Sequence, residues 1–529
     1  MIWLWLSCVV PESSVDSPAL SNTRLLRRMS LDIRGHLPAL EEYAMVQQSD
    51  VDWEPIVVKM LESPEFEEHL VHRFGDLWHT RVDEFDIVAD DFNLDPYEWW
   101  FPFARSIGEE PLRWMAHVAA TDKSWKEIVT SDTLLANDLL VNIFPVDYVD
   151  GTEPEAPNVN NLSTWKESKY QDGRPPVGIL STNGLWWRFP TDSFNMNRTR
   201  AAMITKMLLC DDYLARPIDF TASENIIENT ETAIREDPSC LTCHASLDPL
   251  SSAMFGFWWI ERYNPLEATY YHPERELMGM EMMSVSPAWF GTPVTGFAEV
   301  GEQIANDIRF HQCTIRQSME MLYQRPIKAK DFAQTTEILD AFSTAYQYKS
   351  IWKSILLSKE YRSVLPTNGA PDTEGDRMLS PYQAEHSLRV LTGYVWKSQG
   401  SELMDIDYRT MAGGIDGFQT FERQYYPNLS STVVLERLSQ AHGHFASLNG
   451  LVGSGLDAFD FSISFQDPEF STQLSELRLV LHGREADQQW LGQTLELWIQ
   501  VYDASGQSTQ TAWEIVLGAL FQDIDFVRY

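Results

Sequence analysis

Two cysteines and a histidine form a compact motif in the middle of the chain, Cys240-Leu-Thr-Cys243-His244. The protein has 5 Cys and 12 His in 529 residues. At that composition, chance would produce such a run in roughly one chain in a thousand. Two thiols one helical turn apart can each add to a vinyl group of a haem, and the adjacent imidazole can bind the iron. The motif therefore predicts haem c, attached through Cys240 and Cys243 with His244 as the iron ligand.

Other chemistries of this motif are weaker alternatives. A structural zinc site usually takes four ligands from two paired halves, and the sequence has no second Cys-x-x-Cys and no His pair of the usual spacing. A thioredoxin-like dithiol would need a βαβ pattern around it, whereas the preceding residues read as helix and turn. Zinc, a redox disulfide and a vestigial motif remain the alternatives to haem.

A haem that transfers electrons usually has a sixth iron ligand, most often Met or His. The candidates that follow the motif in sequence are Met278, Met280, Met282, Met283, Met254 and His272. The first four belong to one short Met-rich stretch, whose spacing also suits Cu(I). Methionine more often fills a hydrophobic core. A more distant ligand or an open sixth position is therefore the alternative.

The first ten residues, MIWLWLSCVV, form an apolar run that stops at Pro11. The run is too short to span a bilayer and lacks the basic segment of an ordinary signal peptide. Leu6-Ser7-Cys8, followed by a stretch containing Ser and Pro, resembles the end of a bacterial lipoprotein signal. We expect a lipid anchor at Cys8 and an extracytoplasmic location, in the periplasm or at the surface of the outer membrane. A buried N-terminal segment is the alternative.

The two cysteines not assigned to lipid or haem also fit an extracytoplasmic location. One cysteine for lipid and two for haem leave Cys210 and Cys313. In an oxidising compartment, such a leftover pair is expected to form a disulfide. Separation in sequence does not show whether the two thiols meet in space.

The chain is strongly acidic, with 77 Asp and Glu against 40 Lys and Arg and a net charge of −37. A surface of this sign repels nucleic acid and anionic lipid and attracts basic partners. Nucleic-acid binding is therefore not expected, and a redox partner protein is expected to be basic.

Helical periodicity predominates along the chain. Ser63 and Pro64 predict the start of one amphipathic helix, whereas the polar residues 150–172 predict a long loop. We predict a mainly α, multi-domain protein with a haem module and a mixed α+β C-terminal domain, which has strands at 476–483 and 493–503. The predicted divisions are a signal-like segment and linker (1–20), an N-terminal helical domain (21–150), a c-type cytochrome-like haem region (173–290), a helical module (291–365), a linker (366–377) and a C-terminal module (378–529).

Five stretches resemble one known family. They are RLLRRMSLDIRGHLPALEEY (24–43), LESPEFEEHLVHRFGDLW (61–78), the segment 178–210 before the haem motif, DPSCLTCHASLDPL (237–250), and the helical segment 291–362. Together they resemble the planctomycete-cytochrome-type family of large exported bacterial proteins that carry a single c-type haem motif. The resemblance implies an extracytoplasmic location and a redox or binding role, without a substrate. Ser251 and Ser252 stand where the family often has glycine.

The leading hypothesis is an exported monohaem c-type cytochrome-like protein that transfers one electron to or from a partner. The second is a cell-surface binding or scaffold protein with a structural or vestigial haem site, in which the paired tryptophans could stack on polysaccharide. The third is a haem peroxidase-like oxidoreductase with an open sixth position. No hydrolase, P-loop or dinucleotide-binding signature is found. His442 and His444, two residues apart, are expected in a strand or loop and could bind metal only weakly.

Overall fold

The computed structural model describes residues 19–217, 234–261, 263–363, 377–398, 401–406 and 408–529, with only the backbone described at Ser401. Helices predominate, so the prediction of a mainly α protein is confirmed. None of the helices in these ranges combines the length and hydropathy needed to cross a bilayer. Cys8 and most of the predicted linker 366–377 lie outside the described residues.

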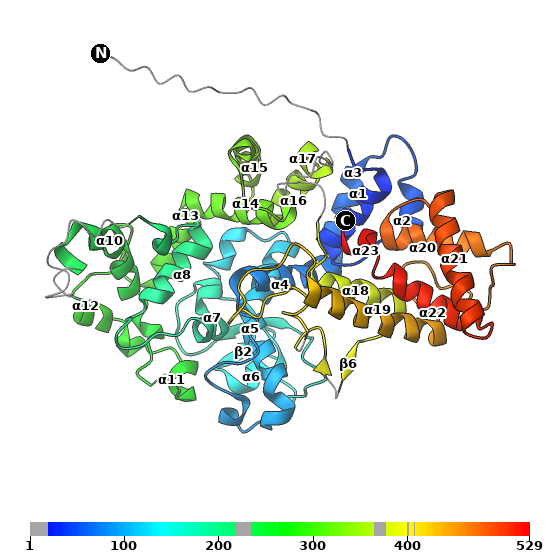
Figure 1. The fold of residues 1–529 in the computed structure, drawn as a ribbon. Helices are drawn as coiled ribbons and strands as arrows, with labels where there is room; N and C mark the ends of the chain where they lie inside the picture. Colours follow the sequence, from blue (N-terminus) through cyan, green and yellow to red (C-terminus); the bar gives the residue numbers. More distant parts are fainter. Residues whose placement is uncertain (1–18, 218–233, 262, 364–376, 399–400, 407) are drawn as a thin grey trace, which may run out of the picture.

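The first half of the chain forms the centre and one end of the molecule, except that its first helices lie towards the other end, beside the C-terminal helices (Figure 1). Its α-helices are α1 (Asn22–Arg34), α2 (Leu40–Met45), α3 (Trp53–Leu61), α4 (Pro64–Trp78), α5 (Pro96–Ala120), α6 (Asp138–Ile143), α7 (Asn183–Arg188), α8 (Arg198–Leu209), α10 (Pro238–Ser252), α11 (Pro265–Thr269) and α12 (Met278–Met283). Short 3-10 turns are η1 (Ala89–Phe92), η2 (Trp125–Ile128), η3 (Gly178–Ser181), η4 (Tyr213–Ala215), η6 (Phe255–Phe257) and η7 (Pro273–Arg275). The long helix α5 packs against α4 and α7.

The second half continues with helices and one further 3-10 turn. They are α13 (Phe297–Asn306), α14 (Ile308–Tyr323), η8 (Ala329–Asp331), α15 (Phe332–Phe342), α16 (Tyr348–Leu356), α17 (Lys359–Arg362), α18 (Pro381–Thr392), α19 (Leu429–Asn449), α20 (Phe470–His482), α21 (Gln488–Ala504), α22 (Thr509–Leu520) and α23 (Ile524–Val527). Helices α20 to α22 form the end of the molecule opposite α10 and α12 (Figure 1).

The described strands are short. β1 (Leu134–Ala136), β2 (Val146–Tyr148) and β3 (Lys166–Tyr170) form an antiparallel sheet in the order β1-β3-β2, and the pairs β4 (Ala288–Trp289) with β5 (Thr292–Pro293) and β6 (Lys397–Ser398) with β7 (Ser401–Glu402) are antiparallel two-residue ladders. The loop prediction for 150–172 is therefore wrong at its end, because β3 is the central strand of the three-stranded sheet. Ser168 and Tyr170 on β3 are buried, which offsets the polarity of the segment.

The two C-terminal strand predictions are wrong. Residues 476–483 lie in and just after α20, and residues 493–503 lie within α21. Leu474, Leu477 and Leu481 are buried at spacings of three and four, which is a helical stripe. On α21, Trp498 stacks on Tyr502 one turn later and meets Trp513 of α22 edge-on. The aliphatic and aromatic residues are dense enough in these segments to suggest strands. In the structure they form the packed faces of helices.

The N-terminal helix α1 lies deep in the protein and joins distant parts of the chain. Its N-terminus is capped by Ser21, its C-terminus by Gly35 in the left-handed conformation, and ten of its 13 residues are buried. Arg27 donates hydrogen bonds to the carbonyls of Leu481 and Phe526. Asp32, with no exposed surface, accepts from Tyr361, Arg377 and Tyr529 at 2.7, 2.5 and 2.7 Å. One buried carboxylate therefore ties α1 to α17 and to the C-terminal residue.

Candidate haem site

The Cys-x-x-Cys-His motif occupies the first two turns of α10. Asp237 caps the helix by accepting from the backbone N–H of Ser239 at 2.8 Å, and Pro238 suits the first turn because it lacks an N–H. Cys240 and Cys243 are free, half-buried thiols. Burial, Asp237 and Cys243 raise the pKa of the Cys240 thiol. Residues spaced by three and four share a helix face, so the two thiols and His244 lie on one side of α10.

His244 is held by a carboxylate that is itself held by an arginine. Its Nδ1 donates to Oδ1 of Asp248 at 2.9 Å. Arg198 on α8 binds the same carboxylate through both oxygens, with Nε–Oδ1 and Nη2–Oδ2 distances of 2.7 and 3.0 Å. Burial would raise the pKa of Asp248, but the hydrogen bonds from His244 and Arg198 outweigh it and lower the pKa. Asp248 therefore stays ionised and fixes His244 with its proton on Nδ1.

This arrangement leaves the second nitrogen of His244 available to a metal. A carboxylate that accepts from one ring nitrogen fixes the ring orientation and makes the other nitrogen a better ligand. In the described part of the chain, no hydrogen bond engages Nε2 of His244. Two unpaired thiols and one oriented imidazole suit a covalently attached haem, so the donor set fits the predicted group.

The first turns of α10 pack against the segment that follows α8. The Tyr213 hydroxyl hydrogen-bonds Ser246 at 2.8 Å, and the Tyr213 carbonyl lies 3.9 Å from the Cys243 sulfur. Arg216 donates to the carbonyl of Thr242 at 2.7 Å. Arg216 also stacks on the Tyr213 ring and pairs with Asp211. The 211–216 segment therefore supports the motif from one side.

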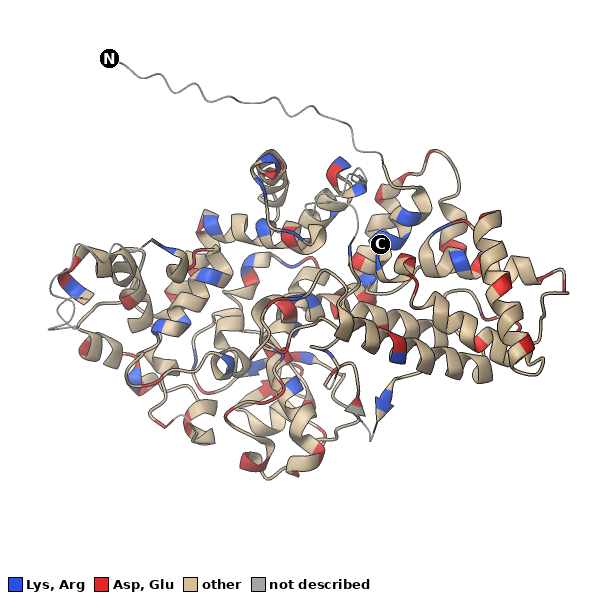
Figure 2. Ribbon diagram, viewed as in Figure 1, with Lys and Arg blue, Asp and Glu red and all other residues tan. Residues whose placement is uncertain are grey.

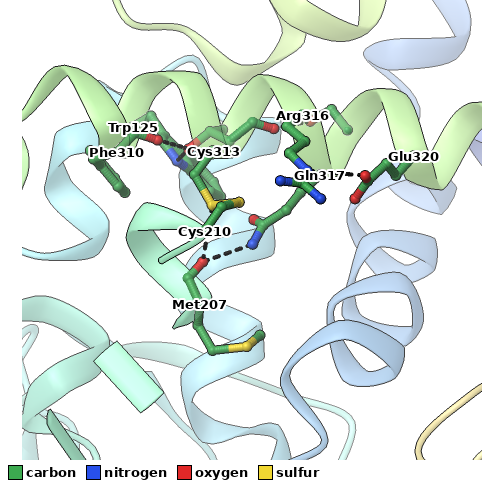
Figure 3. The surroundings of a disulfide bond; sticks show 10 residues. Trp125, Met207, Cys210, Phe310, Cys313, Arg316, Gln317 and Glu320 are labelled. Atoms are coloured by element: carbon green, nitrogen blue, oxygen red, sulfur yellow. Dashed lines mark hydrogen bonds and ion pairs between the residues drawn. A yellow bond between two sulfur atoms is a disulfide. The ribbon is translucent and has the colours of Figure 1, made fainter. Parts of the chain in front are cut away.

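A disulfide anchors this segment. Cys210 is the left-handed C-cap residue of α8 and is bonded to Cys313 on α14, 103 residues later. Figure 3 shows the bond lying beside Gln317, whose side chain donates to the carbonyl of Met207 at 2.7 Å. The two cysteines left over in the sequence are thus bonded to each other, next to the support of the haem motif.

The six candidate sixth ligands have different surroundings. Met254 is fully buried, and His272 has Nε2 at 2.9 Å from the Glu267 carbonyl and Nδ1 at 3.3 Å from Glu274. Met283 packs with Phe255 and Trp258, and Met278 lies against that cluster. Met280 and Met282 are 42% and 39% exposed.

Helix α12, which carries these four methionines, approaches α10 closely. Gly279 faces the carbonyl of Ser252 so closely that a Cβ atom would stand 2.3 Å from that oxygen. Ser252 also donates to the carbonyl of Val285 at 2.9 Å, and Ser251 to the carbonyl of Leu247 at 2.7 Å. The two serines that differ from the family pattern therefore make hydrogen bonds inside the helix and to the end of the α12 segment. The contact lies about two turns beyond His244.

The two C-terminal histidines considered as weak metal ligands, His442 and His444, make hydrogen bonds to other residues of the protein. His442 and His444 lie in α19, so their expected strand or loop is wrong. His442 is buried and bonds Thr392 at 2.8 Å, whereas His444 is exposed and bonds Glu514. Their different neighbours follow from a spacing of two, which places them on different faces of a helix. In the described residues, no group of three or more His, Cys, Asp or Glu side chains is arranged to hold a metal ion.

Asp248 and Arg198 were not identified from the sequence. Asp248 lies four residues after His244, and this spacing alone could have indicated a contact on one helix face. Arg198 lies 50 residues from Asp248, and no local pattern indicates that the two meet.

The comparisons with known proteins place a family match at the N-terminal end of the chain. Residues 11–106 match the family model PSCyt2, described as a protein of unknown function (DUF1549). No curated protein matches the chain, and no solved structure does. The matched segment covers α1 to α4 and ends within α5, well before the haem motif. The N-terminal part of the chain is therefore similar to the planctomycete-cytochrome-type domain family.

Proposed function

We propose that this chain is an exported monohaem c-type cytochrome-like protein that exchanges one electron with a partner protein. Cys240 and Cys243 would hold the porphyrin through thioethers, and His244 would bind the iron through Nε2. The group would supply a one-electron Fe(III)/Fe(II) couple. The observation that carries the proposal is the hydrogen bond from His244 to Asp248, because it orients the imidazole as a metal ligand.

Asp248 and Arg198 set the electrostatics of the ligand. An ionised carboxylate on Nδ1 increases the basicity of Nε2 and favours the more positive state of a bound metal. Arg198 moderates this effect, because its guanidinium shares the carboxylate through two hydrogen bonds. These residues are positioning residues for His244.

Export and lipid attachment at Cys8 belong to the same proposal. The disulfide between Cys210 and Cys313 supports export, since disulfides persist mainly in oxidising compartments. The resemblance of the segment before Cys8 to a lipoprotein signal supports the anchor. Haem c attachment and the disulfide require the same oxidising side of the membrane.

A basic redox partner fits the charge of the chain. Figure 2 shows acidic residues over all parts of the molecule, in keeping with the net charge of −37. Charge complementarity of this kind speeds encounter and weakens as salt screens it.

The test is a spectroelectrochemical titration of protein matured with haem. We expect a reversible wave that fits one electron, about 59 mV per tenfold change in the oxidised-to-reduced ratio. Asp248→Asn should shift the midpoint, because the charge on Nδ1 changes. Haem-loaded protein without a reversible wave would favour the scaffold hypothesis, and turnover of peroxide would favour the peroxidase hypothesis.

A further inference from the structure

A large basic cleft lies apart from the haem motif. It has a volume of about 780 Å³ and is bounded by the second half of α4, the C-terminal half of α14 and the segment 415–426. Figure 1 places α10 at one end of the molecule and α4 near its centre. A cavity of this size accommodates a small organic ligand.

The charge of this cleft is opposite to that of the protein. Seven of its lining residues are Arg or Lys and three are Asp or Glu, although acidic residues outnumber basic ones 77 to 40 over the whole chain. An excess of fixed positive charge in a concave site raises the local concentration of anions. The cleft is therefore suited to an anion in a protein that otherwise repels anions.

Two arginines of the cleft have unused hydrogen-bond donors. Arg73 is 6% exposed and donates through Nη2 to the carbonyl of Met321 at 2.5 Å. Arg423 donates through Nη2 to the carbonyl of Met378. The Nε atom of each is buried, with no partner among the described residues. A buried donor without an acceptor is costly, so both guanidinium groups keep hydrogen-bonding capacity that the described residues do not use.

The two guanidinium groups also repel each other. Burial and the nearby Arg73 lower the pKa of Arg423. The carboxyl group of Asp76 interacts with both arginines, and burial raises its pKa in spite of them. Seven basic residues face three acidic ones in the lining, so Asp76 alone does not balance the arginines of the cleft.

Aromatic and acidic groups complete the lining. Phe421, Tyr425 and Tyr426 are 49%, 43% and 61% exposed, so each ring has surface that a ligand in the cleft can contact. Phe421 is held in place by stacking on His79, with ring centroids 5.4 Å apart. Glu422 can accept hydrogen bonds from hydroxyl groups. Guanidiniums, exposed rings and carboxylates together match a ligand that has an oxyanion, a flat face and hydroxyls.

We infer that this cleft binds an acidic saccharide, with its carboxylate or sulfate on Arg73 and Arg423 and a sugar face against the exposed aromatic rings. This binding does not depend on haem. Guanidinium groups bind such planar or tetrahedral oxyanions through directed, charge-assisted hydrogen bonds.

Isothermal titration calorimetry on the full chain, with digalacturonate and its dimethyl ester, tests the assignment. The two probes share the ring and the hydroxyls and differ in charge. We expect the acid to bind at least about tenfold more tightly than the ester, as the loss of a charge-assisted hydrogen bond implies. Arg73→Gln and Arg423→Gln should each weaken binding of the acid by about the same factor. Arg437→Gln, which removes an exposed arginine outside the cleft, should leave it unchanged.

Equal affinity for acid and ester would overturn the inference even if the arginine variants fail to fold. Undetectable binding of both digalacturonate and a sulfated disaccharide would also overturn it. Binding of adenosine monophosphate in place of either acidic saccharide would reject the saccharide and assign the cleft to a nucleotide.

Discussion

Two buried aspartates in this protein are each paired with an arginine, and their surroundings differ in one respect. Asp32 accepts from Arg377, Tyr361 and Tyr529. Asp248 accepts from Arg198 and from His244, and His244 retains a ring nitrogen that no described residue engages. The described partners of Asp32 are Arg377, Tyr361 and Tyr529. The partner His244 of Asp248 has a second ring nitrogen that can bind a ligand.

The difference indicates what each network contributes. A buried carboxylate is tolerated only when hydrogen bonds and charge compensate its desolvation, and both aspartates meet that condition. Around Asp32 the compensation joins chain segments up to 497 residues apart, so the expected effect is on stability. Around Asp248 it orients an imidazole, so the expected effect is on ligand binding.

Asp32→Ala should have the largest effect on stability. The substitution would leave Arg377, Tyr361 and Tyr529 buried without their common acceptor. We expect a loss of about 3–5 kcal/mol in the free energy of unfolding, as for other broken buried ion pairs, measured by urea denaturation. Asp90→Ala, at an exposed residue, is the control. A loss below about 1 kcal/mol would contradict the role of Asp32 as a structural centre.

Removing the disulfide should have the next largest effect. The pair closes a loop with a sequence separation of 103 residues, and native disulfides typically contribute about 2–5 kcal/mol. Cys210→Ser with Cys313→Ser should therefore lower the urea midpoint. Reductant should lower the wild-type midpoint and leave that of the double variant unchanged. Equal midpoints for oxidised wild type and double variant would show that the 211–216 segment does not need this anchor.

Asp248→Asn should weaken iron ligation by His244 while leaving most of the fold intact. Loss of such a carboxylate typically costs about 10–100-fold in metal affinity. In haem-loaded protein, we expect exogenous imidazole to displace His244 at a correspondingly lower concentration, followed by the visible spectrum. Asp211→Asn, which removes a carboxylate paired with Arg216 nearby, is the matched control. Equal displacement in the two variants would remove Asp248 from its positioning role.

The last expected effect concerns the pH dependence of stability at His482, whose two ring nitrogens, unlike those of His244, are both hydrogen-bonded. Both nitrogens of His482 are engaged, since Arg478 donates to Nδ1 at 2.8 Å and Nε2 donates to the Leu520 carbonyl at 3.0 Å. Burial and Arg478 lower its pKa to about 3. The unfolded chain, with an ordinary histidine pKa near 6.5, therefore binds a proton that the folded chain rejects.

Stability from His482 should be complete above pH 6.5 and should be lost as the pH falls from about 6.5 towards 3. The contribution to the slope is about 1 kcal/mol per pH unit. His482→Gln keeps a donor and an acceptor but does not titrate, so its stability should fall less steeply between pH 6 and 4. Parallel pH profiles for wild type and variant would contradict the lowered pKa of His482.

The sequence predicted local structure well where local rules determine it. The helix expected from Ser63 and Pro64 begins at Pro64. It failed at α20 and α21, because leucine, tryptophan and valine are dense on the helix faces that α22 and α1 help to bury. The density of these residues suggested strands, whereas their helical spacing was the better guide.

The site could be predicted only in part. Cys240, Cys243 and His244 form a contiguous motif, so the sequence alone is enough to propose them as ligands. Arg198 reaches the site from α8, and the basic cleft brings Arg73 together with Arg423, 350 residues later. Tertiary packing creates these contacts, and no spacing within one segment indicates them.

The most direct test of haem c attachment is a pyridine haemochrome spectrum of protein expressed with haem-maturation factors, alongside Cys243→Ala. Covalent haem predicts a c-type band that stays with the denatured wild-type chain and is lost or altered in the variant. A denatured wild-type chain free of haem would contradict the proposal, and Cys240 and Cys243 would then be two thiols on a helix with no electron-transfer role.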